Sequence, residues 1–213
     1  MSRIIAETLR RNRIRDGLVY IQMTRGVAAR DHVFPKSARP SLIVAAKRRS
    51  WPALGAAAKG VAAITALDER WSRCDIKSVG LLPNVLAKEK ARKAGAAEAI
   101  LISKEGVVHE GGSSNVWIVD EAGALHTHPL GPEILGGVTR ATVQQLAERA
   151  QIKVVEEAFS VEKLMAAREV FVTSATSFVK PVVKIDGKTV GDGAVGPVSE
   201  RLFADYNAYT FEG

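Results

Sequence analysis

The spacing of apolar residues changes along the chain, and each spacing indicates a different element of secondary structure. Near the start, Ile4, Ile5 and Leu9 fall on one face of a helix. Ser2 precedes this face and is a candidate N-cap. The same helical spacing predicts further helices over residues 82–94, 138–150 and 197–209, and a short one over 161–168.

Short apolar runs bounded by turn residues predict strands. These runs cover residues 18–24, 41–46, 61–67, 115–120, 124–127, 152–155, 169–173 and 179–185. Turns that contain glycine, at 104–106 and 121–123, predict two hairpins. Helices and strands are mixed without regular alternation, which favours an α+β fold over a doubly wound parallel sheet.

One stretch of the chain is a candidate boundary between domains. Residues 50–60 are rich in alanine, glycine and proline, and residues 25–40 are polar and irregular. We therefore expect part of a small N-terminal domain over residues 1–48, a linker over 49–60 and a larger domain over 61–213.

The composition is that of a globular protein, with 46% hydrophobic and 25% charged residues. No apolar run is long enough to span a membrane, so we expect no membrane partner. The N-terminus has no apolar segment of the kind found in signal peptides. The single cysteine, Cys74, excludes an internal disulfide and indicates a cytoplasmic protein.

Charge and histidine content narrow the range of partners. The net charge of +7 comes from scattered lysines and arginines, so we expect anionic small molecules rather than nucleic acid. His126 and His128 share one face of a predicted strand, but no third metal ligand is evident near them. We therefore expect no metal site.

Two segments contain residues suited to chemistry on a small molecule. Lys77 lies in an apolar setting, where a lysine can react as a neutral amine and form a Schiff base with an aldehyde. An exposed strand lysine is the alternative interpretation. Glu110 precedes two glycines and two serines, a pattern that suits a tight loop against a ligand. Its carboxylate could pair with a protonated ring nitrogen, and a simple hairpin loop is the alternative.

Two further segments suit the binding of a phosphate group. Gly136 and Gly137 precede the helix predicted over 138–150, and free N–H groups at a helix N-terminus attract anions. Small hydroxyl residues over 173–177 end an apolar strand and could add further donors. A flexible start of a helix and a capped turn would give the same two patterns.

In their order along the chain, these segments resemble the fold-type IV aminotransferases, which use pyridoxal 5′-phosphate. The family's lysine segment is similar to RCDIKSVGLLPNVLAKEKARKAG, and its glutamate loop is similar to EGGSSNVWIV. The start of its phosphate-binding helix is similar to ILGGVTRATV, and its second phosphate loop to VFVTSATS. Because the matches extend over nearly the whole chain, the resemblance implies the family's fold and its cofactor.

The resemblance also implies a role for each matching residue. Lys77 corresponds to the Schiff-base lysine that shuttles the proton, and Glu110 to the acid that keeps the pyridine nitrogen protonated. The remaining matches are Ser113 and Ser114 beside the ring, Leu135 on a ring face, and Val138, Thr139, Ser174 and Ala175 around the phosphate. The family often has a hydroxyl residue where this chain has Ala175, so one side-chain donor is expected to be missing there.

The branch of the family is indicated further upstream. The segment YIQMTRGVAARDHVFP resembles the part of D-amino-acid transaminases that contains an Arg-x-His pair, which binds the substrate carboxylate. In this chain the pair corresponds to Arg30 and His32. A guanidinium binds a carboxylate through two hydrogen bonds, and a nearby imidazole adds a donor. The resemblance therefore implies a homodimer that transfers amino groups between a D-amino acid, such as D-alanine, and a 2-oxo acid, such as 2-oxoglutarate. Two ordinary surface-loop residues are the alternative interpretation.

Three other functions stay open for a chain of this fold. A branched-chain aminotransferase and an aminodeoxychorismate lyase share the fold, but Arg30 and His32 favour the D-amino-acid branch over both. A non-catalytic fragment is the third, because Met1 aligns with the middle of the family's small domain. We accordingly expect the family's phosphate-binding arginine and substrate-side tyrosine to have no counterpart in these 213 residues.

Overall fold

The computed structural model describes residues 1–50 and 59–211 and contains two compact units, Met1–Ala53 and Leu54–Gly213. The stretch predicted to be a linker, residues 49–60, lies largely outside the described residues. No helix in the described ranges is long and apolar enough to cross a membrane.

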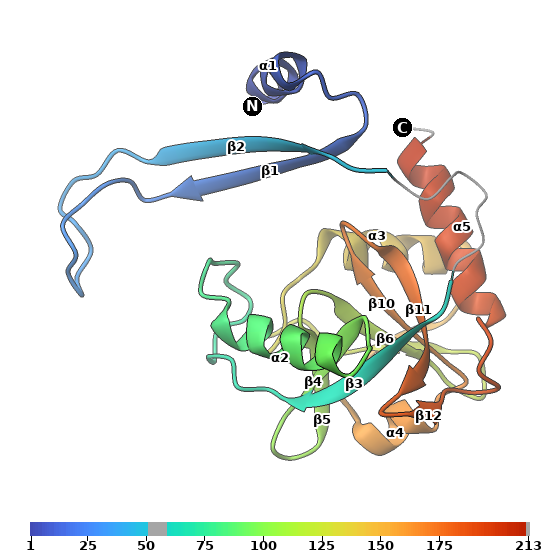
Figure 1. Ribbon diagram of the computed structural model, residues 1–213. Helices are drawn as coiled ribbons and strands as arrows, with labels where there is room; N and C mark the ends of the chain where they lie inside the picture. The colour runs from blue at the N-terminus through green and yellow to red at the C-terminus, as the bar shows by residue number, and fades with distance from the viewer. Residues whose placement is uncertain (51–58, 212–213) are drawn as a thin grey trace. The chain divides into compact units, whose positions relative to one another are not determined.

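Over its described residues, 1–50, the first unit contains one helix and one hairpin (Figure 1). The helix α1 (Ser2–Asn12) contacts β2 (Ser41–Arg48), which pairs antiparallel with β1 (Gly17–Thr24). Met1 is the N-cap of α1, and it makes no side-chain capping bond. The predicted cap at Ser2 is therefore wrong by one residue, because Ser2 already belongs to the helix.

The second unit is built around a ten-stranded mixed sheet with the order β8-β7-β6-β10-β11-β3-β4-β5-β9, in which β12 also pairs with β11. Its strands are β3 (Val61–Leu67), β4 (Glu98–Ile102), β5 (Val107–Gly111), β6 (Asn115–Val119), β7 (Leu125–Thr127), β8 (Val154–Glu156), β9 (Phe159–Ser160), β10 (Glu169–Ser174), β11 (Phe178–Ile185) and β12 (Lys188–Thr189). β3 pairs in parallel with β11 and β4, and β7 with β8, whereas the other pairs are antiparallel. This mixed topology agrees with the predicted α+β class.

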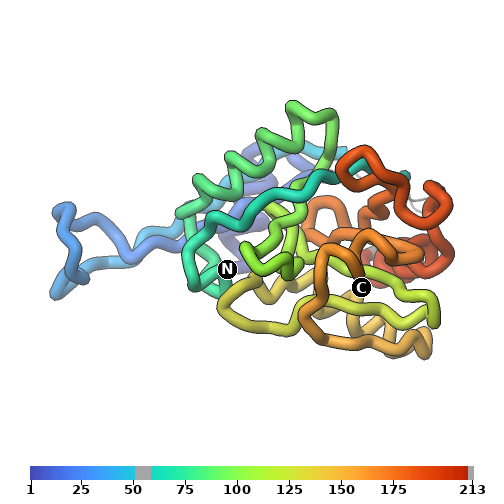
Figure 2. Tube along the Cα trace, turned by 90° about the horizontal axis from the view of Figure 1, so that it is seen from below, coloured from blue at the N-terminus to red at the C-terminus, as the bar shows by residue number. Residues whose placement is uncertain are grey.

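Helices cover the sheet on more than one side. They are α2 (Leu82–Lys93), α3 (Val138–Arg149), α4 (Val161–Met165) and α5 (Pro197–Phe211). α2 contacts β3 and β4, and Figure 2 shows it running alongside β3. α5 contacts β10, β11 and α3, which brings the C-terminal helix close to the helix predicted to bind phosphate.

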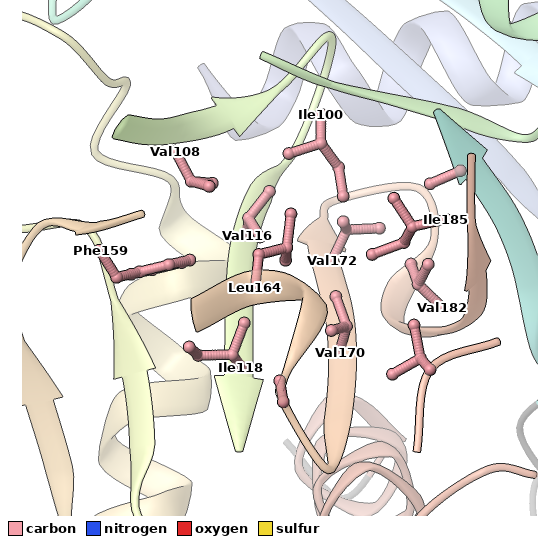
Figure 3. Close-up of a cluster of buried hydrophobic side chains, with 13 residues drawn as sticks. Ile100, Val108, Val116, Ile118, Phe159, Leu164, Val170, Val172, Val182 and Ile185 are labelled. Carbon is pink, nitrogen blue, oxygen red and sulfur yellow. The ribbon is translucent and has the colours of Figure 1, made fainter. Parts of the chain in front are cut away.

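The central strands are buried on both faces, which explains their continuous apolar sequences. Val170 and Val172 of β10 belong to one core cluster, whereas Phe171 between them belongs to another. Successive side chains of a strand point to opposite faces, so each cluster fills one side of the sheet. Figure 3 shows the first cluster, in which Leu164 of α4 lies among valine and isoleucine side chains of the sheet. This rigid core positions the strand ends described next.

Candidate active site

Glu110, near the end of β5, is the centre of a buried hydrogen-bond network. Its Oε2 accepts hydrogen bonds of 3.0 Å from the Asn115 side chain and of 3.0 Å from the backbone N–H of Leu135. Its Oε1 accepts a hydrogen bond from Nη1 of Arg70. Burial raises the pKa of Glu110, while the charge and hydrogen bond of Arg70 act in the opposite direction. An ionised carboxylate has about four acceptor positions, so one remains for a further donor.

Arg70 links Glu110 to a second carboxylate. It binds Asp68 through two hydrogen bonds, of 2.9 Å to Oδ1 and 2.7 Å to Oδ2, and it donates another of 2.9 Å to the carbonyl of Glu133. Burial opposes the charge on Asp68, but the hydrogen bonds from Arg70 and His109 outweigh it and hold the pKa of Asp68 well below its usual range. Arg70 and Asp68 were missed as candidates, although both closely follow the apolar run of β3.

We expect Asp68→Asn to lower the free energy of unfolding by about 3 kcal/mol at pH 7, because a buried arginine loses its bidentate partner. A carboxyl with a lowered folded-state pKa stabilises the fold above about pH 5, and this contribution is lost as the pH falls through that pKa. The difference in the free energy of unfolding between Asp68→Asn and the parent should therefore become smaller at acidic pH. Urea unfolding at several pH values measures it.

Asp75 provides the matched control for this prediction. It also binds an arginine two residues away through two hydrogen bonds, each of 2.8 Å to Arg73, but this pair is exposed. Exposed pairs contribute little because water and salt screen them, so Asp75→Asn should leave the stability nearly unchanged. Equal effects of the two substitutions would contradict a stabilising role for the buried pair.

Asn115 connects Glu110 to the start of α3. Its Nδ2 donates to Glu110 and, at 2.8 Å, to the carbonyl of Leu135. Its Oδ1 lies so close to Gly137 that a Cβ on that glycine would be 2.3 Å away. Glycine is therefore required at 137 for close approach to Asn115. This contact fixes the helix N-terminus relative to the buried carboxylate.

The start of α3 has the features of an anion site. Gly137 is its N-cap, and no side chain in the described part of the chain caps the first turn. The N–H groups of that turn point out of the helix and favour negative charge. Thr139 is buried, with 3% of its surface exposed, whereas Val138 is exposed. Both predicted residues therefore lie at the helix end that the glycines precede.

The second predicted phosphate loop is a turn between β10 and β11. Ser174 ends β10, and its hydroxyl lies 2.6 Å from that of Ser177 and accepts a hydrogen bond of 3.2 Å from the backbone N–H of Ser177. Ala175 is exposed in the same turn and offers no side-chain donor. The turn therefore uses the Ser174 hydroxyl largely to close itself.

The serines after Glu110 differ in their surroundings. Ser114 is buried and donates a hydrogen bond of 2.8 Å to Glu98, which lies 3.0 Å from the amine of Lys88. Ser113 is exposed. The Ser114 hydroxyl thus binds Glu98 rather than Glu110, and of the two serines Ser113 alone presents an exposed side chain.

Lys77 lies in the loop between β3 and α2. Both Lys77 and Ile76 are exposed, so the apolar neighbour does not bury the amine. The loop is held to the segment before α3, because Cys74 donates a backbone hydrogen bond of 2.7 Å to the carbonyl of Pro132. Glu110 is tied to that same segment at Leu135. The structure therefore attaches the lysine loop and the buried carboxylate to one stretch of chain.

Arg30 and His32 belong to the first unit. They lie in the connection between β1 and β2, and both side chains are exposed. The backbone N–H of His32 donates a hydrogen bond of 2.6 Å to Asp31. Within the described ranges, no group of three or more histidine, cysteine, aspartate or glutamate residues is arranged to hold a metal ion.

The sequence matches the amino-transferase class IV family over residues 1–185. The chain belongs to the class IV aminotransferases. The D-alanine aminotransferase of Staphylococcus haemolyticus is 47% identical over 207 residues, which cover 97% of this chain and 72% of the relative. That of Bacillus licheniformis is 44% identical over 191 residues, which cover 90% of this chain and 66% of the relative.

Solved structures of class IV aminotransferases share this fold. The T.th. branched-chain amino acid aminotransferase with pyridoxamine 5′-phosphate is 30% identical with a TM-score of 0.83, over 96% of this chain and 68% of its own. The Escherichia coli branched-chain amino acid aminotransferase is 26% identical with a TM-score of 0.80, over 93% and 67%. The predicted fold-type IV architecture is therefore confirmed, and the chain is an aminotransferase.

Proposed function

We propose that this aminotransferase catalyses reversible transamination between a D-amino acid, such as D-alanine, and a 2-oxo acid, such as 2-oxoglutarate, with pyridoxal 5′-phosphate. The observation that carries the proposal is the buried Glu110, tied through Asn115 to an uncapped helix N-terminus. The D-alanine aminotransferases at 43–47% identity support this branch of the family.

The residues present fit a phosphorylated pyridine. Glu110 keeps one acceptor position for the N–H of a protonated ring, and the first turn of α3 offers free donors to a dianion. We assign the ring to Glu110, Leu135, Ser113 and Ser114, the phosphate to Val138, Thr139, Ser174 and Ala175, and the covalent attachment to Lys77. When bound, the cofactor supplies the carbonyl that takes the amino group and a ring that withdraws electrons.

The chain's own residues then have distinct tasks. Glu110 keeps the ring nitrogen protonated, and Arg70 and the Leu135 N–H offset part of the cost of burying its charge. The Nζ of Lys77 takes the proton from the substrate Cα in the half-reaction that releases the 2-oxo acid. In the half-reaction that forms the new amino acid, it delivers a proton to Cα. Arg30 and His32 bind the substrate carboxylate and so orient the substrate.

The assay that tests this function supplies D-alanine and 2-oxoglutarate and measures pyruvate and glutamate. L-leucine with 2-oxoglutarate is assayed in parallel, because the solved branched-chain aminotransferases with TM-scores of 0.80–0.83 favour that function as the second candidate. We expect turnover with D-alanine. Activity confined to L-leucine would reject the D-amino-acid assignment and support the branched-chain alternative.

We expect Arg30→Ala to raise the KM for D-alanine by about tenfold to a hundredfold, because the substrate carboxylate would lose a charge-assisted bidentate contact. The absorbance of the resting cofactor should stay the same, because Arg30 is assigned to the substrate. Arg25→Ala is the matched control, since the Arg25 guanidinium lies 3.9 Å from the Phe34 ring centre in the same connection. An unchanged KM in Arg30→Ala would contradict the carboxylate-binding role.

The single cysteine, Cys74, supports action in the cytoplasm, where thiols stay reduced. Large exposed apolar side chains in the second unit, among them Trp71, Val79 and Leu82, support burial against a second copy in a homodimer.

A further inference from the structure

Tyr206 of α5 lies next to the candidate phosphate site. Its hydroxyl is 3.5 Å from Oγ1 of Thr139, in the first turn of α3. Its ring centre is 5.2 Å from that of Phe178, the first residue of β11 after the turn that contains Ser174 and Ala175. A residue near the C-terminus therefore contacts α3 and also the strand that follows the second phosphate loop.

The two hydroxyls are close but make a poor hydrogen bond with each other. Hydroxyl pairs prefer separations of about 2.7–2.8 Å, so at 3.5 Å both retain most of their capacity to donate. Neither hydroxyl has another hydrogen-bond partner among the residues that the structure describes. Thr139 is almost completely buried, and a buried hydroxyl without a good partner is unfavourable. Both hydroxyls are therefore available to donate a hydrogen bond to a further acceptor.

The surroundings indicate an anionic acceptor. The first turn of α3 is uncapped, so its N–H groups and its dipole favour negative charge beside Thr139. In the turn between β10 and β11, the Ser174 hydroxyl is engaged with that of Ser177, and Ala175 has no side-chain donor. A hydroxyl from α5 would add a side-chain donor beside that of Thr139.

We propose that Tyr206 is a further phosphate-binding residue, whose hydroxyl donates, together with that of Thr139, to the phosphate of the cofactor. This inference rests on the proposed function, since it needs the phosphate at the start of α3. It gives the C-terminal helix a role in holding the cofactor in addition to covering the sheet.

The test is Tyr206→Phe, which keeps the ring on Phe178 and removes only the hydroxyl. Apo-protein is titrated with pyridoxal 5′-phosphate, and separately with pyridoxal, which has no phosphate. We expect the Kd for pyridoxal 5′-phosphate to rise about tenfold or more, because a hydrogen bond to a charged group is lost. The Kd for pyridoxal should stay that of the parent, and the ³¹P resonance of bound cofactor should shift.

Tyr209→Phe is the matched control. Tyr209 lies on the same helix, with its ring centre 6.4 Å from that of Tyr206, and it is exposed. It should keep the parent's affinity and ³¹P resonance. The inference would be overturned if Tyr206→Phe kept the parent's Kd for pyridoxal 5′-phosphate and its ³¹P resonance, or if it lost equal affinity for pyridoxal. In either case, tight binding of pyridoxal 5′-phosphate by the parent would still support the proposed site. A parent chain that binds no pyridoxal 5′-phosphate would overturn both.

Discussion

We expect Lys77→Ala to lower the rate of D-alanine transamination by on the order of a thousandfold or more, because the reaction would lose the amine assigned to move the Cα proton. The side chain is exposed in a loop whose backbone is held at Cys74, so its removal should leave the fold intact. Steady-state rates and the thermal unfolding midpoint, measured on the same preparation, separate loss of chemistry from loss of structure.

Lys90→Ala serves as the control for this prediction. Lys90 is exposed on α2, only a few turns further along the chain, and has no assigned role. It should keep the parent's rate. If Lys77→Ala retained the parent's activity, another amine would have to perform the proton transfer and the assignment of Lys77 would fail.

Glu110→Gln should slow the half-reaction with D-alanine by on the order of a hundredfold or more, since stabilisation of developing charge is usually the largest single term in catalysis. The substitution nearly preserves shape and removes the negative charge that is to face the ring nitrogen. Arg70 keeps its bidentate partner Asp68, so the network should survive. Stopped-flow absorbance of the bound cofactor measures the half-reaction directly.

Glu169→Gln is the matched control for the loss of a buried carboxylate. Glu169 is buried in β10 and accepts hydrogen bonds from the backbone N–H groups of Val198 and Ser199 at the start of α5. Its substitution should reduce stability but keep the half-reaction rate per bound cofactor. If Glu110→Gln kept the parent's half-reaction rate, the assignment of Glu110 as the partner of the ring nitrogen would be contradicted.

Local patterns predicted most elements but not their arrangement. Glycines in the turns and helical or strand-like spacing of apolar residues located the hairpins, α3 and α5 to within a few residues. The sheet order was not predictable, because β11 pairs in parallel with β3, a strand more than a hundred residues earlier. Such long-range pairs depend on packing of both sheet faces, which neither segment encodes alone.

The site was predicted only as far as motifs extend. The resemblance drew attention to Glu110 and the glycines before α3, whose surroundings fit a ring and a phosphate. It did not indicate that Arg70 would be buried against Glu110, since arginine is rarely buried without a partner and Glu110 lies 40 residues further along the chain. The position of Tyr206 beside Thr139 was also not predictable, because a tyrosine on an amphipathic helix normally indicates core packing.

The central claim, that this chain binds pyridoxal 5′-phosphate on Lys77 at the site centred on Glu110, is tested most directly by covalent trapping. The protein is loaded with the cofactor, reduced with borohydride, digested and analysed by mass spectrometry. We predict one labelled peptide, with the label on Lys77. A label on Lys88, Lys90 or any other lysine, or no label at all, would contradict it.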